Sequence, residues 1–327
     1  MQATVTRPLR ILLSSQCADN LGAQVAAALG RRPHEIVRAS PRVDDAPGDV
    51  DIGFISRDVT GLSTKHVVQE PLQAFYASLR RSPALRWVHV HSAGADRPIF
   101  AELRERGVQV STSPGANAEV VAQTALAGVL ALARHFPLLL EAQRRREWVS
   151  LVASGLPADL AGQHAIVVGW GPIGQRIAGY LRMLGLRVTV ARRQREPGAG
   201  PDLSTIAYAE LDIHAAQADW LVLACPLTEQ TRGLVGPATL AAIKPGARLV
   251  NVARGEVIVQ ASLEAALRES RLSGAYLDVF EFEPLPRDSA LWQMPNVIVT
   301  PHSAGHSDGN ERRVARIFLD LLGQWRD

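Results

Sequence analysis

Cysteine, net charge and long apolar runs are all scarce in this sequence of 327 residues. Its two cysteines, Cys17 and Cys225, lie too far apart to share metal-ligand spacing, and so few cysteines in a chain of this length indicate a reducing cytoplasm. The formal net charge is only +3, and no block of basic residues is interleaved with aromatic side chains. We therefore expect no nucleic-acid partner.

No apolar run is long enough for a membrane span. The longest, residues 120–133, is interrupted by Gln123 and Thr124, so it predicts a buried helix. The short apolar stretch at residues 9–13 lies near Arg7 and Arg10 and predicts a first strand, not a signal peptide. These features predict a cytoplasmic protein without a membrane partner.

A glycine-rich motif, GWGPIG at residues 169–174, directly follows the apolar run AIVV at residues 165–168. This order predicts a strand, a tight turn and a helix that begins near Ile173. The first glycine permits the turn, the second lets the backbone approach a pyrophosphate, and the third lets the helix lie close to the strand. We therefore expect a dinucleotide to be bound by Gly169, Gly171, Pro172, Ile173 and Gly174.

The hydrophobic pattern predicts two doubly wound α/β domains. Before the glycine motif, helical segments alternate with short apolar strands expected at residues 9–13, 52–55, 87–90 and 108–110. After the motif, strands are expected at residues 187–190, 220–224, 248–252, 275–278 and 297–300. Such alternation is typical of parallel sheets covered by helices on both faces.

The central position of the motif predicts that a dinucleotide-binding Rossmann domain is inserted into a second domain. The expected ranges are residues 115–301 for the Rossmann domain and residues 1–114 with 302–327 for a flavodoxin-like substrate domain. A helix over about residues 117–134 would bridge the two domains. A helix over about residues 311–325 would return to the first domain, because no strand is left for it to cover in its own sheet.

Two adjacent arginines favour NADP(H) over NAD(H). In a Rossmann unit, an acidic residue about twenty residues beyond the glycines binds the ribose hydroxyls of the adenosine. Here the second strand is followed by Arg192 and Arg193, and no acid occurs before Glu196. Guanidinium groups can bind a 2′-phosphate bidentately. The alternative is that both arginines are solvated loop residues, in which case NADH would also serve.

Three further residues have the chemistry needed to reduce a ketone. Arg254 follows a predicted strand, where ligands bind in open α/β sheets, and its guanidinium suits a carboxylate and a carbonyl together. His302 follows another strand and could donate a proton near neutral pH, and Glu283 paired with it would favour the charged imidazolium. Taken singly, each residue could equally be a surface or loop residue. Their occurrence together after a glycine motif favours a catalytic site.

These motifs closely resemble the D-isomer-specific 2-hydroxyacid dehydrogenase family, over about residues 87–305. The resemblance is carried by residues 169–174, 251–255, 278–285 and 291–302. It implies that Arg254 is catalytic, that His302 is the acid/base and that Glu283 is its partner. It also implies that the backbone N–H groups of Ala93 and Gly94 hold the substrate carboxylate opposite Arg254.

The resemblance further implies a set of cofactor contacts and a homodimer, formed by the region around residues 117–148. Asp278 and His302 would line the nicotinamide site, and the remaining contacts would be Cys225, Pro226, Thr231, Val252 and Ala253. Two positions depart from the family pattern. Pro172 stands where Arg or Lys is common, and Gln123 stands where Glu is frequent.

The sequence therefore predicts an NADPH-preferring reductase of small 2-oxo acids, such as glyoxylate or hydroxypyruvate, that forms D-2-hydroxy acids. A phosphite dehydrogenase on the same scaffold is one alternative, and a non-catalytic dinucleotide-sensing regulator is another. A formate dehydrogenase is disfavoured because Glu283 stands where that type has an amide. No metal is expected, since His89 and His91 lack a third ligand and His302 and His306 lie in a loop.

Overall fold

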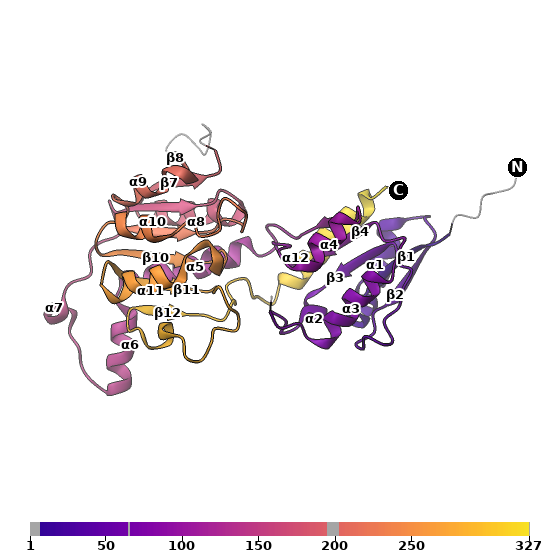
Figure 1. Ribbon diagram of the computed structural model, residues 1–327, viewed down its shortest axis with the longest axis horizontal. Coiled ribbons are helices and arrows are strands. Elements are labelled where there is room, and N and C mark those ends of the chain that lie inside the picture. Colours follow the sequence, from indigo (N-terminus) through magenta and orange to yellow (C-terminus); the bar gives the residue numbers. More distant parts are fainter. Residues whose placement is uncertain (1–6, 65, 195–202, 327) are drawn as a thin grey trace, which may run out of the picture. The chain divides into compact units, whose positions relative to one another are not determined.

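The computed structural model describes residues 7–64, 66–194 and 203–326, which form two compact units (Figure 1). Unit 1 comprises Met1–Asn117 and Ser307–Asp327, and unit 2 comprises Ala118–His306. The divisions lie three and five residues beyond the boundaries expected from the sequence. As a result His302, which we expected at the start of the returning segment of the first domain, belongs to unit 2. The reason is local, because its backbone N–H donates to the carbonyl of Asp278 at 2.8 Å.

Unit 1 is a five-stranded parallel sheet with the strand order β2-β1-β3-β4-β5. Its side chains alternate between two cores: Ile11 and Leu13 face one and Leu12 faces the other. The unit contains the strands β1 Leu9–Leu13, β2 His34–Arg38, β3 Ile52–Ile55, β4 Trp87–Val90 and β5 Gln109–Ser111. Its helices are α1 Ser15–Leu29, α2 Arg57–Thr60, α3 Glu70–Arg80, α4 Pro98–Glu105 and α12 Asn310–Gln324.

Helix α12 completes the core of unit 1, although it lies about 200 residues further along the chain than the last strand of that unit. Val314, Phe318 and Leu322 recur at helical spacing and form its buried stripe. The Phe318 ring stacks on Phe54 of β3, with 4.4 Å between ring centroids and 6° between ring planes. Burial of one such side chain contributes about 1.5–3 kcal/mol to folding. Unit 1 is therefore built from both ends of the described chain.

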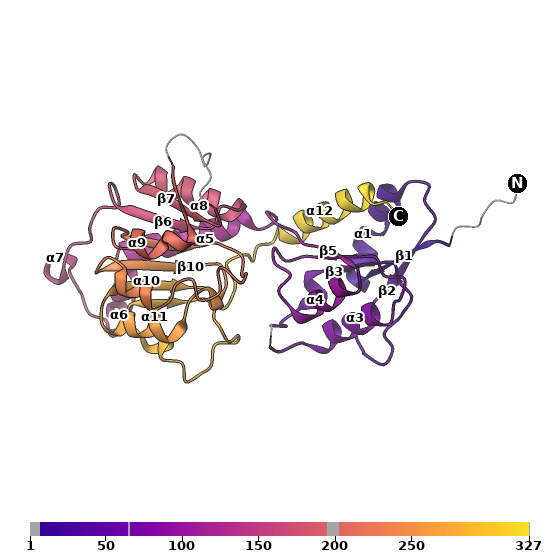
Figure 2. The ribbon, with the colours of Figure 1, turned by 45° about the horizontal axis from the view of Figure 1, so that its top comes forward.

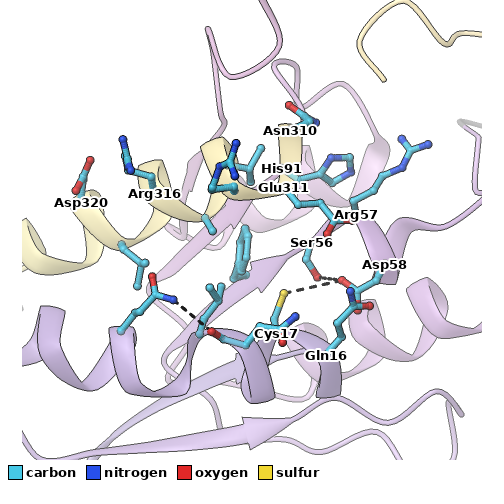
Figure 3. A pocket seen from close by; sticks show the side chains of 18 residues that line it. Gln16, Cys17, Ser56, Arg57, Asp58, His91, Asn310, Glu311, Arg316 and Asp320 are labelled. Atoms are coloured by element: carbon cyan, nitrogen blue, oxygen red, sulfur yellow. Dashed lines mark hydrogen bonds between the residues drawn. The ribbon is translucent and has the colours of Figure 1, made fainter. Parts of the chain in front are cut away.

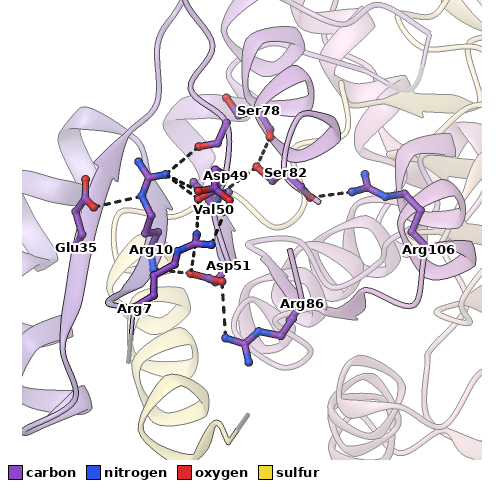
Figure 4. Close-up of polar contacts among 11 residues, drawn as sticks. Arg7, Arg10, Glu35, Asp49, Val50, Asp51, Ser78, Ser82, Arg86 and Arg106 are labelled. Atoms are coloured by element: carbon purple, nitrogen blue, oxygen red, sulfur yellow. Dashed lines mark hydrogen bonds and ion pairs between the residues drawn. The ribbon is translucent and has the colours of Figure 1, made fainter. Parts of the chain in front are cut away.

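A buried carboxylate holds together the amino ends of β1 and β3 (Figure 4). Asp51 is 7 % exposed, and its Oδ2 accepts a hydrogen bond from the backbone N–H of Arg10 at 2.8 Å. The guanidinium groups of Arg7 and Arg86 lie 3.6 and 3.8 Å from its oxygens. Because these donors replace the lost hydration, the charge can stay buried at the amino ends of these two strands.

Unit 2 is a seven-stranded parallel sheet with the order β12-β11-β10-β9-β6-β7-β8. Figure 2 labels β6, β7 and β10 of this sheet. Its strands are β6 His164–Val168, β7 Arg187–Arg192, β8 Ser204–Ala207, β9 Trp220–Leu223, β10 Ala247–Asn251, β11 Leu272–Leu277 and β12 Val297–Val299. Its helices are α5 Ala118–Ala133, α6 Phe136–Arg145, α7 Leu151–Ser154, α8 Pro172–Met183, α9 Leu211–Ala215, α10 Pro237–Ala242 and α11 Gln260–Arg268, with short 3₁₀ turns at Tyr208–Glu210, Gly255–Val257 and Ala290–Gln293. The two parallel sheets confirm the predicted fold class.

The apolar segment at residues 120–133 lies within α5 and supplies much of one core of unit 2. Within the described ranges, no single helix is both long and apolar enough to cross a membrane. Helices α5 and α6 reach that length only as a pair bent by 68°.

Candidate active site

The glycine turn between β6 and α8 has the geometry that a dinucleotide requires. Gly169 has a φ of 105°, and a Cβ there would come within 2.7 Å of the backbone of Cys225. A Cβ on Gly174 would lie 2.1 Å from the carbonyl oxygen of Gly169, so only glycine lets α8 lie this close to the turn. Apart from its own chain neighbours, no described residue lies within 4 Å of where a Cβ on Gly171 would be. The turn is thus tight against the protein on one side and open at the N-terminus of α8, which fits a pyrophosphate.

Pro172 and Ile173 form the first turn of α8, where the missing N–H of proline would be unpaired in any case. Arg192 is the last residue of β7 and is half-buried, and Arg193 follows it on the surface. Burial raises the pKa of the Tyr208 phenol to about 12, and the positive charges of the two arginines oppose this shift. Glu196, the first acid after them, lies outside the described residues.

The other expected cofactor contacts shape loops at the carboxyl ends of the strands. Cys225 is buried, and burial raises the pKa of its thiol to about 12, so the thiol stays neutral. Thr231 is also buried; its hydroxyl donates to the carbonyl oxygen of Pro226 at 2.6 Å and accepts from the Thr228 N–H at 2.8 Å. Its side chain therefore closes the loop after β9. The side chains of Val252 and Ala253 are buried.

Glu283 and His302 meet directly, although 19 residues separate them in sequence. The Nδ1 of His302 lies 2.8 Å from Oε2 of Glu283, whose other oxygen accepts from the Phe280 N–H at 3.1 Å. The carboxylate is 14 % exposed and the imidazole 48 % exposed. The pair thus fixes Nδ1 as the bonded nitrogen and leaves Nε2 as the one that can exchange a proton with a ligand.

Arg254 lies on a segment that packs against the chain leading to Glu283. Its Nη1 donates to the carbonyl oxygen of Ala253 at 2.7 Å. A Cβ on the next residue, Gly255, would fall 1.8 Å from the backbone carbon of Phe280, so the two segments touch through their main chains. The loops after β10 and β11 are therefore neighbours, as parallel strands require.

Two residues at these strand ends hold loops in ways that the sequence analysis did not predict. The Asn251 side chain accepts from the Ala253 N–H at 3.0 Å and donates to the Arg254 carbonyl at 3.1 Å, which fixes the backbone that carries the guanidinium. Asp278 was expected to line the nicotinamide site. It is 2 % exposed, and its carboxylate accepts bonds from the backbone N–H groups of Ser303 and Ala304. Its observed partners thus belong to the turn that carries His302.

The expected substrate loop lies in unit 1, after β4. The hydroxyl of Ser92 donates to the carbonyl oxygen of Gly94 at 2.6 Å, which closes a turn with Ala93 exposed at its tip. The loop is therefore on unit 1, whereas Arg254, Glu283 and His302 are on unit 2.

A cavity of about 540 Å³ adjoins this loop within unit 1 (Figure 3). Residues of helices α1 and α12 line it, together with Phe54 of β3. His91, which directly precedes the loop, and Ser56 and Arg57, which follow β3, also line it. Across the described part of the chain, no three His, Cys, Asp or Glu side chains are grouped as metal ligands.

The chain is similar to known proteins along most of its length. Residues 126–304 match the family model described as D-isomer specific 2-hydroxyacid dehydrogenase, NAD binding domain. Glyoxylate/hydroxypyruvate reductase B of Erwinia tasmaniensis is 36 % identical over 246 residues, which cover 75 % of this chain and 76 % of that protein. Glyoxylate reductase of Thermococcus gammatolerans is 32 % identical over 299 residues, 89 % of this chain and 86 % of that protein.

Solved structures agree. The D-isomer specific 2-hydroxyacid dehydrogenase from Xanthobacter autotrophicus Py2, crystallised in complex with NADPH and MES, has a TM-score of 0.73 and 29 % identity, and the match covers 96 % of this chain and 93 % of that one. These matches confirm the resemblance that the motifs predicted. The chain belongs to the D-isomer specific 2-hydroxyacid dehydrogenase family.

Proposed function

We propose that the protein is an NADPH-preferring reductase that converts small 2-oxo acids, glyoxylate or hydroxypyruvate, into D-2-hydroxy acids. Its membership of the family makes it a 2-oxo acid reductase that uses a nicotinamide dinucleotide. The observation that carries the proposal is the pair formed by His302 and Glu283 at 2.8 Å, beside the Arg254 segment and in the same unit as the glycine turn.

Each residue of the site has one task in this reaction. The reduced nicotinamide, when bound, supplies a hydride to the carbonyl carbon of the substrate. Arg254 binds the carboxylate and the carbonyl oxygen, and the N–H groups of Ala93 and Gly94 bind the carboxylate. His302 gives its Nε2 proton to the oxygen as negative charge develops there, so the ketone becomes an alcohol. Glu283 accepts from Nδ1, orients the ring and stabilises the imidazolium before the proton leaves.

A variant of His302 tests this assignment. His302→Ala should lower kcat by about two to four orders of magnitude, the usual contribution of general acid catalysis, and should leave NADPH binding intact. Stopped-flow or steady-state NADPH oxidation at 340 nm measures the first, and titration of NADPH fluorescence measures the second. Comparable turnover in the variant would refute the proton-donor role.

The preference for NADPH rests on Arg192 and Arg193 at the end of β7. Replacing them by Asp and Ser should raise the KM for NADPH by about tenfold or more, since each charge-assisted bond to a phosphate contributes roughly 1.5–3 kcal/mol, and should leave the KM for NADH similar or lower. Arg187→Ser, at the amino end of the same strand, is the matched control. An unchanged ratio of the two KM values would contradict the assignment.

The choice of substrate is open to a direct assay. A panel should include glyoxylate, hydroxypyruvate and longer 2-oxo acids with NADPH, and phosphite and formate with NADP. Turnover of phosphite alone would replace the proposed reaction by phosphite oxidation, and no turnover with tight NADPH binding would favour a sensing role.

We also infer that a second copy of the chain covers α6 and α7. This segment carries apolar side chains on its surface, among them Phe136, Leu138, Leu140 and a Trp148 that is 99 % exposed. Clusters of this kind typically mark protein interfaces. Sedimentation of Leu140→Glu/Trp148→Glu should give a monomer where the wild type gives a dimer. Ile213→Glu, on an exposed face of α9, should leave the dimer unchanged.

A cytoplasmic location suits the two cysteines, which are both free thiols. Burial raises the pKa of Cys17 and of Cys225, so both stay protonated and weakly reactive. A thiol titration of protein isolated under anaerobic conditions should find two thiols per chain after denaturation; one or none would contradict this placement.

A further inference from the structure

A buried tyrosine lies beneath the turn that carries His302. Tyr276 belongs to β11, is 5 % exposed, and its hydroxyl lies 2.7 Å from Oγ1 of Thr300. Its ring occupies the space where α5 has a glycine, because a Cβ on Gly128 would come within 2.6 Å of the ring. Glycine inside a helix costs about 1 kcal/mol relative to alanine. Gly128 therefore lowers the stability of α5, and its lack of a side chain leaves space for the Tyr276 ring.

The direction of the hydrogen bond follows from its neighbours. The Thr300 hydroxyl donates its own proton to Oδ1 of Asp278 at 2.7 Å, so the phenol of Tyr276 must be the donor to Thr300. Burial raises the pKa of Tyr276, so the phenol keeps its proton throughout the working pH range. The result is a chain of donors that runs from Tyr276 through Thr300 to the buried carboxylate of Asp278.

That carboxylate holds the turn on the other side of His302. Its Oδ1 accepts from the backbone N–H groups of Ser303 at 2.9 Å and Ala304 at 3.1 Å, and its Oδ2 accepts from Ala304 at 3.0 Å. Between these anchored residues and Thr300, His302 has a φ of 51°, a left-handed conformation that a non-glycine residue adopts only when its surroundings impose it. The conformation that presents the imidazole to Glu283 is therefore imposed by the Asp278 network.

Helix α5 also forms a hydrogen bond with the turn that carries His302. The single hydroxyl proton of Thr124 is shared between the carbonyl oxygen of Ala304 at 3.2 Å and that of Val120 at 3.0 Å. Thr124 lies one helical turn before Gly128, so the residue that binds the turn and the residue that admits the Tyr276 ring share one face of α5. The turn is thus held between α5 and β11.

We propose that Tyr276 is a positioning residue for His302: through Thr300 and Asp278 it holds residues 300–304 so that the imidazole stays paired with Glu283. The inference rests on the proposed role of His302 as proton donor. It assigns a function to a side chain that touches neither substrate nor cofactor in the proposed reaction.

Tyr276→Phe tests the proposal in the full-length enzyme, with NADPH and the best oxo acid of the panel. It removes one hydroxyl and keeps the ring that fills the space beside Gly128. Since one hydrogen bond contributes about 0.5–1.5 kcal/mol, kcat should fall about two- to tenfold, while the KM for NADPH stays the same. The alkaline limb of the kcat profile should move to lower pH, because the imidazolium is paired with Glu283 for less of the time.

Three matched variants separate positioning from general destabilisation. Tyr180→Phe removes a hydroxyl that bonds to Glu119 on α5 and should change neither kcat nor its pH profile. Thr300→Ser keeps the hydroxyl relay and should retain most of the activity, whereas Thr300→Val should reproduce the loss. A uniform loss of kcat at every pH, with the alkaline limb unmoved, would show a merely structural role and overturn the proposal.

A readout that is independent of activity distinguishes this proposal from the proposed function. In Tyr276→Phe the backbone amides of Ser303 and Ala304 should exchange with solvent deuterium faster than in the wild type, because the acceptor that protects them is less firmly held. Unchanged exchange there would overturn the positioning role even if His302 is the proton donor. Full turnover in His302→Ala would refute the proposed reaction, and the exchange rates would still decide whether Tyr276 holds the turn.

Discussion

Acid should destabilise unit 1 through His89, a buried histidine on β4. The neighbours of His89 fix the ring as a neutral tautomer. Ser113 donates its hydroxyl to the carbonyl oxygen of Val90 at 3.1 Å, so it accepts from Nε2 of the histidine at 2.9 Å. Ser111 accepts from the indole N–H of Trp87 at 2.7 Å and is left to donate to Nδ1 at 2.8 Å. A second proton on Nδ1 would meet a hydroxyl that is already donating to it.

The size of the effect follows from the displaced pKa. Burial lowers the pKa of His89 from 6.5 to about 4. The unfolded chain therefore takes up a proton at a higher pH than the native chain, so the stability due to the neutral ring is complete above pH 6.5 and is lost as the pH falls toward 4. Each pH unit in this window costs about 1.4 kcal/mol, which gives about 3 kcal/mol in all. Burial also lowers the pKa of His91 to about 4, so His91 adds to the same loss of stability per pH unit.

Urea unfolding, followed by circular dichroism at several pH values between 7 and 4.5, measures the slope of the free energy of unfolding against pH. His89→Gln should be less stable at pH 7, because it loses ring packing, but its free energy of unfolding should fall less steeply with acid, by about 1.4 kcal/mol per pH unit. Ser111→Ala keeps the buried imidazole and should keep the wild-type slope. Equal slopes in the wild type and His89→Gln would refute the reasoning.

Three further outcomes are expected. Gly174→Ala should weaken NADPH binding by at least about tenfold in a fluorescence titration, since its Cβ would lie 2.1 Å from the carbonyl oxygen of Gly169. Gly179→Ala in the same helix should bind NADPH normally, because no described atom outside its own part of the helix lies within 4 Å of the added Cβ. Asp51→Ala should lower the free energy of unfolding by about 1–3 kcal/mol in urea, because the partly buried backbone N–H of Arg10 loses its acceptor; an unchanged midpoint would contradict this. Glu283→Gln should reduce kcat mainly above neutral pH, because an amide stabilises the imidazolium less than a carboxylate does. A pH profile parallel to that of the wild type would speak against the pairing.

The fold class could be predicted because the central strands of both sheets are continuously apolar and the glycine motif marks the turn after the first strand of unit 2. The strands that the sequence analysis missed are edge strands. In β2, His34–Arg38, only Val37 is buried, and in β8, Ser204–Ala207, only Ile206 is buried. An edge strand is covered less completely than a central one, so its pattern resembles that of a polar loop.

The candidate site was only partly readable from the sequence. The pairing of Glu283 with His302 was predicted, and the structure brings the two side chains together, but their catalytic roles stay predictions. The anchoring role of Asp278 could not be predicted, because the sequence alone does not distinguish a carboxylate that binds a ligand from one that binds a neighbouring turn. The contact of Tyr276 with Gly128 joins residues 148 positions apart, and only the packing of α5 on the sheet creates it.

The way α12 closes the core of unit 1 has a consequence for synthesis on the ribosome. Phe54 and Trp87 emerge early, but the Phe318 ring that stacks against both is translated only after all of unit 2. Until then only α1 covers that apolar face of the first sheet, while the Rossmann sheet, although made later, already has every strand and helix of its own. We therefore expect unit 2 to become stable before unit 1, although the first residues of unit 1 leave the exit tunnel earlier.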